Sequence, residues 1–324
     1  MDAMRQSVAT ESTHPPMISL KHVTVVQNVT TDPKGVYAGP VVAFFEQHGM
    51  GVLTIPVETK DMPVVPVDAP NPDLVVVLGG DGTFLRAAQV FNHHQVPMVG
   101  INTGRLGFLT RIEANNVQGY LEKLMAGQYT IEETMTLSVM RTGPTLAKAD
   151  SDPTAQISQL AINDVVVKNA NPSQMCTLNL YINETLVATY DADGLIVSTP
   201  MGTTAYNLSA GGPVLSPEVE AMTITPICPH SFSAKSVVVP ANKTVRIQSD
   251  SKNQHVVVAL DGQDYGHATN GAYEDACLLP GESLQVFKSP LSLRVVNFEE
   301  YEDNFYIILK KKLDWSMNPR HRTP

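Results

Sequence analysis

The sequence predicts two domains in succession, an N-terminal doubly wound α/β domain and a C-terminal domain of mostly antiparallel β-strands. Two observations support this fold class. Up to about residue 128, strand-like runs alternate with segments whose apolar residues recur at helical spacing. From about residue 129, strand-like runs follow one another across short turns, and helical patterns are scarce. The length of 324 residues is also that of roughly two domains.

The first domain is predicted from alternating strand and helix signals. Residues 74–78 are all apolar, as expected of a parallel strand buried on both faces. Thr83 is the predicted cap of the helix that follows the next turn. Pro40 weakens the first turn of another predicted helix, and Gly127 is placed to end a third. The predicted strands are 23–26, 52–55, 74–78 and 96–101, and the predicted helices are 37–48, 84–91 and 117–125.

The second domain is predicted from strand-like runs that are not separated by long helices. These runs are 157–167, 175–182, 186–190, 195–199, 236–239, 245–249, 256–260, 283–287 and 291–296. The amphipathic segment 305–315 predicts a terminal helix, which we expect to return to the first domain. The predicted division is a mobile tail at 1–17, an α/β domain at 18–128 completed by 297–318, and a β-rich domain at 129–296.

Composition excludes several classes of protein. The chain has 22 basic and 32 acidic residues and a net charge of −10, so a broad nucleic-acid-binding surface is not expected. An anionic ligand would need backbone N–H groups, a metal ion or a few local arginines. The three cysteines do not form the pattern of a disulfide framework or a zinc site, so we expect a reducing, cytoplasmic setting. No apolar run approaches the about 18 residues of a membrane helix.

A glycine-rich turn, Gly79-Gly80-Asp81-Gly82, follows the apolar strand and directly precedes a helix. Glycines let the backbone approach an anion, and a helix N-terminus offers free N–H groups, so the turn is a candidate phosphate site. A carboxylate at Asp81 repels phosphates unless it holds a metal ion or accepts a proton from an attacking hydroxyl. The alternative is a tight turn in which Asp81 only caps the helix.

A second loop, 102–109, follows the next predicted strand and therefore shares the same rim of the sheet. Arg86 and Arg105 are nearby cations that could pair with phosphate, or could equally be solvated surface residues. The alternative for the loop is an ordinary strand–helix connection.

A third segment, 193–207, begins as a strand and ends in small and hydroxyl residues suited to ribose and amide recognition. Tyr206 could stack on a base, or could be a core tyrosine in a hydroxyl-rich turn. Smaller candidates are Asn163-Asp164 within an apolar run and Asp261-Gly262-Gln263 at a strand end, where an exposed edge or a hydrogen-bonded turn is an equally simple explanation.

The ordered set of motifs resembles the NAD kinases of bacterial type. The motifs are GGDGTFL at 79–85, NTGRLGFLT at 102–110, Asn-Asp at 163–164, DGLIVSTPMGTTAYNLSAGGP at 193–213, TPICPHSFSAK at 225–235 and DGQ at 261–263. The resemblance implies that ATP phosphorylates the 2′-hydroxyl of the adenosine ribose of NAD to give NADP. It also implies a divalent metal, usually Mg²⁺, a homodimer or homotetramer, and a site between an α/β domain that binds ATP and a β-sandwich-like domain that binds NAD.

The resemblance also assigns roles to individual residues. It makes Asp81 the general base, and it names no metal ligand. Met201 stands where the family usually has Ser or Thr, and Asp164 stands where Glu is common. The implied NAD contacts are Asp81, Gly82, Asn163, Asp164, Asp193, Thr204, Ala205, Tyr206, Asn207, Leu208, Ser209 and Gln263. The implied phosphate and ATP contacts are Gly79, Gly80, Gly82, Thr83, Arg86 and Asn102.

Two other functions remain open from the sequence. The motif GGDGT is shared with lipid kinases of the diacylglycerol class, but the chain has no obvious basic amphipathic helix for a membrane surface. A module that binds NAD(P) without turnover and regulates a partner is the other alternative. An intact Asp81 argues against it.

Overall fold

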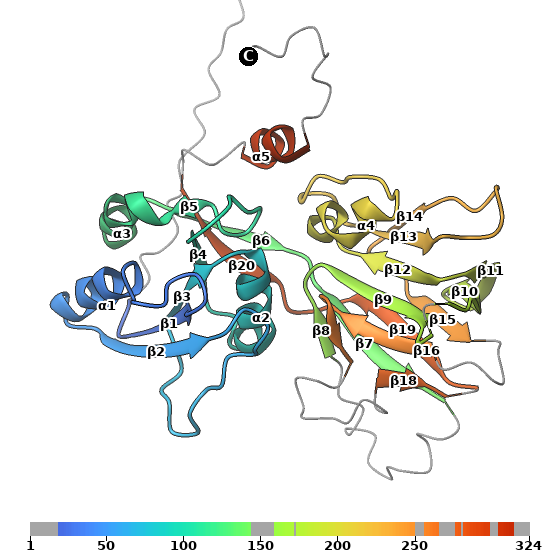
Figure 1. Cartoon of the computed structure of the whole chain (residues 1–324), viewed down its shortest axis with the longest axis horizontal. Helices are drawn as coiled ribbons and strands as arrows, with labels where there is room; N and C mark the ends of the chain where they lie inside the picture. Colours follow the sequence, from blue (N-terminus) through green and yellow to red (C-terminus); the bar gives the residue numbers. More distant parts are fainter. Residues whose placement is uncertain are drawn as a thin grey trace, which may run out of the picture.

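The computed structural model describes residues 19–143, 159–171, 173–249, 256–265, 276–279, 281–298 and 304–313. Two bodies lie side by side, an α/β domain and a domain of β-sheets, with helix α5 (Asn304–Leu313) above the place where they meet (Figure 1). The predicted tail at 1–17 lies outside the described residues. Among the described helices, none has the length and apolar composition needed to cross a membrane.

The first domain is a mainly parallel sheet with helices on both faces, which confirms the predicted doubly wound arrangement. Its strand order is β2-β1-β3-β4-β20-β6, with β5 beside β4, and only β6 is antiparallel to its neighbour. The strands are β1 (His22–Asn28), β2 (Gly51–Val57), β3 (Leu74–Gly79), β4 (Met98–Asn102), β5 (Ile112–Glu113), β6 (Thr130–Thr134) and β20 (Leu293–Asn297). The helices are α1 (Ala38–Gln47), α2 (Asp81–Phe91) and α3 (Val117–Met125).

The continuous apolar run of β3 is explained by the layers around it. Val76 and Leu78 pack with α1 and α3 on one face, whereas Val75 and Val77 pack with α2 on the other. Strand β3 therefore carries the glycine-rich turn from the centre of the sheet, and α2 starts directly at Asp81. The site of the turn is fixed by a strand that is fully buried on both sides.

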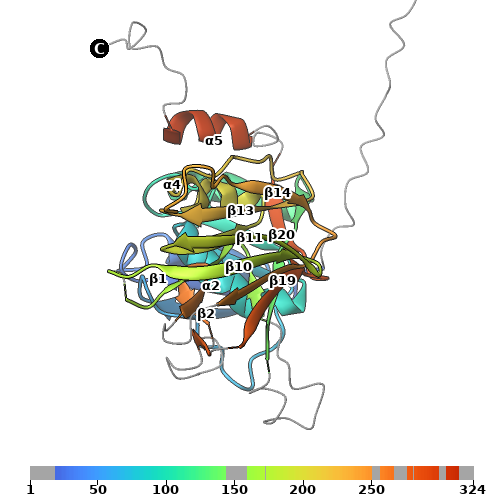
Figure 2. The same ribbon diagram turned by 90° about the vertical axis from the view of Figure 1, so that its right-hand side faces the viewer.

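The second domain consists of two antiparallel sheets. One has the order β11-β10-β15-β19-β7-β8: β7 (Leu137–Thr142), β8 (Gln159–Ala161), β10 (Cys176–Ile182), β11 (Thr185–Ala192), β15 (Val245–Ser249) and β19 (Ser283–Lys288). The other has the order β14-β13-β12-β9-β16-β17, with β18 beside β16: β9 (Asp164–Asn169), β12 (Gly194–Ser198), β13 (Ala221–Ile227), β14 (Val237–Pro240), β16 (Val256–Leu260), β17 (Gln263–Asp264) and β18 (Cys277–Leu278). Figure 2 shows β10, β11 and β19 of one sheet below β13 and β14 of the other. One core contains side chains from both sheets, so the β-sandwich is confirmed.

The domain limits differ from the predicted 129–296. Strands β6 and β20 lie at the two ends of that range, yet both belong to the parallel sheet of the first domain. The pairing joins Leu293 to Thr134 and Asn297 to Thr130, so it connects segments about 160 residues apart, which local patterns do not reveal. The chain thus leaves the first sheet after β6, builds the sandwich and returns with β20.

Two local predictions also need correction. The run predicted at 157–167 is divided at Ile162–Asn163 into β8 and β9, which belong to different sheets. The N-cap of α2 is Gly80 rather than Thr83. The Thr83 hydroxyl instead accepts a hydrogen bond of 2.9 Å from the side-chain amide of Asn28. Thr83 therefore joins the start of α2 to β1.

Candidate functional site

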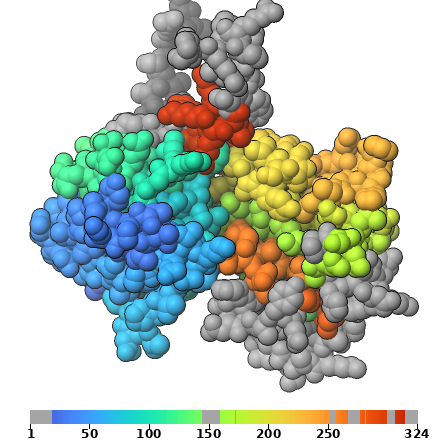
Figure 3. Space-filling view, viewed as in Figure 1, coloured from blue at the N-terminus to red at the C-terminus, as the bar shows by residue number. Residues whose placement is uncertain are grey.

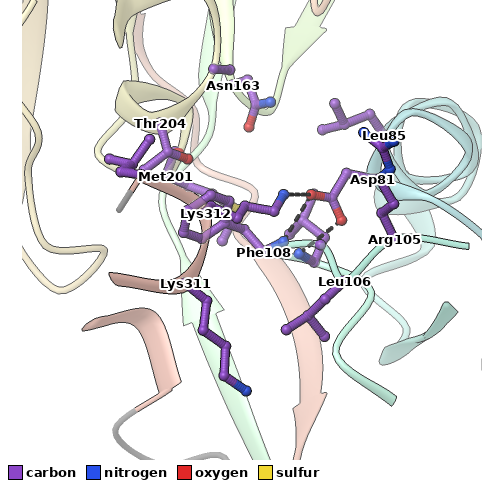
Figure 4. Close-up of a pocket in the computed structure, with 14 residues that line it drawn as sticks. Asp81, Leu85, Arg105, Leu106, Phe108, Asn163, Met201, Thr204, Lys311 and Lys312 are labelled. Carbon is purple, nitrogen blue, oxygen red and sulfur yellow. Dashed lines mark hydrogen bonds and ion pairs between the residues drawn. The ribbon is translucent and has the colours of Figure 1, made fainter. Parts of the chain in front are cut away.

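A cavity of about 860 Å³ lies where the two domains meet. Its walls come from the start of α2, the loop after β4, the turn between β8 and β9, the segment after β12, and the end of α5 (Figure 4). In the space-filling view, α5 covers part of the junction between the domains (Figure 3). The lining residues are Asp81, Leu85, Arg105, Leu106, Gly107, Phe108, Leu109, Asn163, Met201, Thr204, Ala205, Lys311, Lys312 and Leu313.

Asp81 is the first residue of α2, and its carboxylate binds the loop after β4. Oδ1 accepts hydrogen bonds from Leu109 N at 3.1 Å, Thr110 N at 3.0 Å and Thr110 Oγ1 at 3.0 Å. Oδ2 accepts one from Phe108 N at 2.8 Å and lies 3.7 Å from Lys312 Nζ. The carboxylate makes no cap hydrogen bond to its own helix, so the predicted alternative of an Asp81 helix cap is wrong; the side chain instead joins the turn to the loop after β4.

Gly107 is required by this contact. A Cβ atom at this position would overlap Asp81 Oδ1 and lie within 2.5 Å of Thr110 Oγ1. The two glycine-rich loops expected on one rim of the sheet are therefore in direct contact, and the absence of a side chain at Gly107 lets the Asp81 carboxylate reach the backbone of the second loop.

Asn102 orders the loop after β4 through hydrogen bonds of its buried side chain. Its side-chain amide donates to Thr110 Oγ1 at 3.0 Å and to the Arg105 carbonyl, and its oxygen accepts from Gly104 N at 2.7 Å. With 5% of its surface exposed, Asn102 does not line the cavity. Of the two candidate cations, Arg105 lines the cavity and Arg86 does not. Burial lowers the pKa of Arg86, and the nearby Asp61 carboxylate opposes this shift.

Asp261 belongs to a segment that the sequence offered as a smaller candidate, but the resemblance assigned a contact only to Gln263 of that motif. Its carboxylate accepts hydrogen bonds from the backbone N–H groups of Ile162 at 2.8 Å, Asn163 at 2.6 Å and Asp164 at 3.1 Å. These donors form the turn between β8 and β9, so Asp261 holds Asn163 at the cavity. The available signal was the Asp-Gly pair at a strand end, which adopts positive φ at both residues here.

Helix α2 links the two halves of the site. Its Gln89 side-chain amide donates to Asp261 Oδ2 at 2.9 Å and to the Leu260 carbonyl at 3.4 Å. One end of the helix therefore carries Asp81 into the cavity, while the other contacts the residue that organises the opposite wall. Gln89 is therefore a direct contact between the two domains beside the site.

The segment after β12 is held largely by hydrogen bonds to a buried side chain. Asn207 is fully buried; it accepts hydrogen bonds from the hydroxyls of Thr223 and Thr225 and donates to the Thr203 and Pro213 carbonyls. Its neighbour Tyr206 has 43% of its surface exposed, so it is not a core tyrosine.

The cavity brings together only part of the predicted set. The predicted residues that line it are Asp81, Asn163, Thr204 and Ala205, together with Met201 at the position that departs from the family pattern. The predicted residues that do not line it are Gly79, Gly80, Gly82, Thr83, Arg86, Asn102, Asp164, Asp193, Tyr206, Asn207, Leu208, Ser209 and Gln263.

Asp164 is a buried carboxyl group whose pKa is raised to about 7. Burial is the largest cause and the Asp261 carboxylate adds to it, while a backbone hydrogen bond from Tyr206 opposes the shift. The proton that Asp164 retains therefore stabilises the folded state fully below about pH 4, and this contribution is lost as the pH rises toward 7.

Replacing Asp164 by Asn should remove this pH dependence. From pH 4 to pH 7 we expect the wild type to lose up to about 4 kcal/mol of unfolding free energy relative to Asp164→Asn, because one pKa unit corresponds to about 1.4 kcal/mol. Urea unfolding of both proteins at several pH values measures the difference. Two curves that stay parallel over this range would show that Asp164 does not retain its proton.

The described part of the chain contains no group of three or more His, Cys, Asp or Glu side chains able to hold a metal ion. Mg²⁺ at phosphoryl-transfer sites is usually bound by one or two carboxylates together with substrate phosphates and water. The cavity offers the Asp81 carboxylate, which suits a metal ion shared with a substrate but not a closed protein cage.

Two solved structures share this fold. A yeast NADH kinase complexed with NADH has a TM-score of 0.75 and 22% sequence identity, and the match covers 94% of this chain and 90% of that chain. An NAD kinase from Archaeoglobus fulgidus in complex with ATP has a TM-score of 0.66 and 24% identity, over 89% of this chain and 98% of that chain. At these identities, the likeness establishes the fold.

Family comparisons match both domains. Residues 46–129 match the family described as ATP-NAD kinase N-terminal domain, and residues 162–295 match the ATP-NAD kinase C-terminal domain. The NAD kinase of Heliobacterium modesticaldum is 41% identical over 241 residues, 74% of this chain and 78% of the relative. The NAD kinase of Azoarcus sp. is 39% identical over 252 residues, 77% and 78% of the two chains. The chain therefore belongs to the NAD kinase family, whose members are phosphotransferases.

Proposed function

We propose that the protein transfers the γ-phosphoryl group of ATP to the 2′-hydroxyl of the adenosine ribose of NAD, giving NADP and ADP. The observation that carries the proposal is a carboxylate, Asp81, at a cavity that both domains line. Asp81 and its loop form the wall of the first domain, whereas Asn163, Thr204 and Ala205 form the wall of the second. Phosphoryl transfer needs such opposed positioning of donor and acceptor more than covalent catalysis.

Asp81 is the proposed general base, and Oδ2 is the atom that would accept the proton. Oδ1 already accepts three hydrogen bonds, whereas Oδ2 accepts one from Phe108 N and faces Lys312. As the 2′-oxygen bonds to the γ-phosphorus, its proton passes to Oδ2, and the bond to the ADP oxygen breaks. A positioned base of this kind contributes about 10²–10⁴ in rate.

The remaining predicted contacts are proposals for the two substrates. For NAD, Asn163, Asp164 and Asp193 offer polar groups, and the exposed ring of Tyr206 offers a face on which a base can stack. Gly82, Gln263 and the other residues of 204–209 complete the proposed NAD contacts, with the buried Asn207 acting by shaping this segment.

On the phosphate side we propose Gly79, Gly80, Gly82 and Arg86 as direct contacts. Thr83 and Asn102 would act by shaping the two loops, because their side chains are engaged in internal hydrogen bonds. A divalent cation, with Mg²⁺ the proposed one, would be held chiefly by the ATP phosphates and water beside Asp81, whose Oδ1 is engaged by three donors and whose Oδ2 is the proposed base, and it would neutralise charge that develops on the phosphates.

The decisive experiment is to incubate the purified protein with NAD, ATP and Mg²⁺ and to detect NADP with an NADP-specific dehydrogenase. We expect NADP to form, and to stop forming when EDTA removes the metal. Polyphosphate in place of ATP, and NADH in place of NAD, define the substrate range. Phosphorylation of diacylglycerol in vesicles without NADP formation would instead support a lipid kinase, and saturable NAD binding without turnover would support a sensor.

The resemblance also predicts a homodimer or homotetramer. This assembly remains a proposal, which light scattering of the purified protein tests directly. A mass equal to that of one chain of 35.1 kDa would contradict it.

A further inference from the structure

The terminal helix α5 lies against both domains at the mouth of the site. The rings of Phe305 and Phe108 have centroids 5.8 Å apart, which places α5 on the loop that binds Asp81. On the other side, Leu309 and Val214 line a second, smaller cavity beside the segment after β12. Ile308 and Leu309 are buried, and Phe305 contacts Phe108. The lysines at the end of α5 therefore lie at the mouth of the cavity.

Lys312 extends from α5 to Asp81, as Figure 4 shows. Its Nζ lies 3.7 Å from Asp81 Oδ2 and 4.7 Å from the centre of the Phe108 ring, and 35% of the side chain is exposed. Lys311 carries a second charge but extends away from Asp81 in the same view. Lys312 is thus the α5 lysine whose charge faces the proposed base.

The cavity has a positive balance in a strongly acidic chain. Within the described lining, Arg105, Lys311 and Lys312 carry positive charge and Asp81 carries negative charge, whereas the whole chain has a net charge of −10. A local excess of cations at a concave site attracts an anionic ligand. A lysine ammonium is a compact charge with three donors that suits a phosphate oxygen.

We propose that Lys312 binds a phosphate oxygen of the ATP triphosphate, and that α5 is the element that delivers this contact. The inference rests on the proposed phosphoryl transfer. Without nucleotide, Lys312 pairs with Asp81 Oδ2 at a distance and exposure at which an ion pair adds little stability. A phosphate group is a stronger partner, so the ammonium leaves Oδ2. That oxygen, the proposed proton acceptor, is then free for the ribose hydroxyl.

The test compares Lys312→Met with Lys310→Met. Lys310 lies on the same helix and its replacement removes the same charge, but it does not line the main cavity. Because a hydrogen bond to a charged group is lost, we expect Lys312→Met to raise KM for ATP about tenfold or more, with KM for NAD little changed. Lys312→Arg should recover most of the loss. Lys310→Met should stay within about twofold of the wild type.

Binding of inorganic triphosphate, measured by calorimetry without NAD, separates this inference from the proposed function. If the wild type binds triphosphate about tenfold more tightly than Lys312→Met, the inference stands even if no NADP forms. Unchanged triphosphate affinity and unchanged KM for ATP in Lys312→Met would overturn it. A rise in KM for NAD alone would overturn the assignment to ATP. Higher activity of Lys312→Met would show instead that the lysine blocks Asp81. Melting temperatures of all variants confirm that they are folded.

Discussion

Asp81→Asn should lower turnover by at least about 10², the lower end of the contribution of a positioned base. Two effects act together. The amide cannot take the proton of the 2′-hydroxyl. It also replaces one carboxylate oxygen by an NH₂ group, which would face the N–H of Phe108 if it occupied the place of Oδ2. The measurement is kcat for NADP formation, with circular dichroism to show that the fold is retained.

A control is needed because Asp81 also holds the loop after β4. Thr110→Val removes the hydroxyl that donates to Asp81 Oδ1 and accepts from Asn102 Nδ2, and it leaves Oδ2 untouched. We expect a loss of at most about 30-fold in kcat, because each of the two hydrogen bonds contributes about 1 kcal/mol. If Thr110→Val lowered kcat as much as Asp81→Asn, the importance of Asp81 would lie in holding the loop. Near-normal turnover of Asp81→Asn would exclude the base.

Asp261→Asn should abolish NAD affinity and destabilise the protein by about 3 kcal/mol, the scale of breaking a charged hydrogen-bond network. Each carboxylate oxygen receives two donors: Asn163 N and Asp164 N on Oδ1, and Ile162 N and Gln89 Nε2 on Oδ2. An amide group turns one of these positions into a donor that faces two other donors. The turn that presents Asn163 therefore cannot keep its shape.

Unfolding in urea and calorimetric titration with NAD measure the two effects. Asp264→Asn is the matched control, because Asp264 is an exposed residue on the neighbouring strand β17. Gln89→Leu divides the network further: it removes the contact from α2 but leaves the three backbone donors in place. We expect Gln89→Leu to raise KM for NAD and to lower the free energy of unfolding less than Asp261→Asn does. Wild-type stability and NAD affinity in Asp261→Asn would exclude an organising role for Asp261.

Much of the fold could be predicted because local patterns determine it. Strand β3 is buried on both faces and is therefore apolar throughout, and each helix of the first domain shows its buried face as a stripe. The pairing of strands could not be predicted in the same way. The sequences of β6 and β20 do not indicate that these two strands pair, because the whole sandwich lies between them in the chain and pairing depends on the position of distant segments.

The candidate site was predictable where chemistry needs a particular residue in a particular turn, as at Asp81. It was not predictable where a residue acts on a distant backbone. Asp261 binds a turn almost 100 residues away, and Gln89 reaches it from another domain. Lys312 lies outside the motifs on which the resemblance was based, so only its position against Asp81 makes it a candidate.

The return of β20 has a consequence for how the chain folds during its synthesis. This strand lies between β4 and β6 in the first sheet, and its buried Leu293 and Val295 belong to the core that α2 covers. The ribosome delivers these residues only after the whole sandwich has been made. The first sheet of a nascent chain therefore has an unpaired edge until β20 has been synthesised. The domain that is synthesised first is thus completed last.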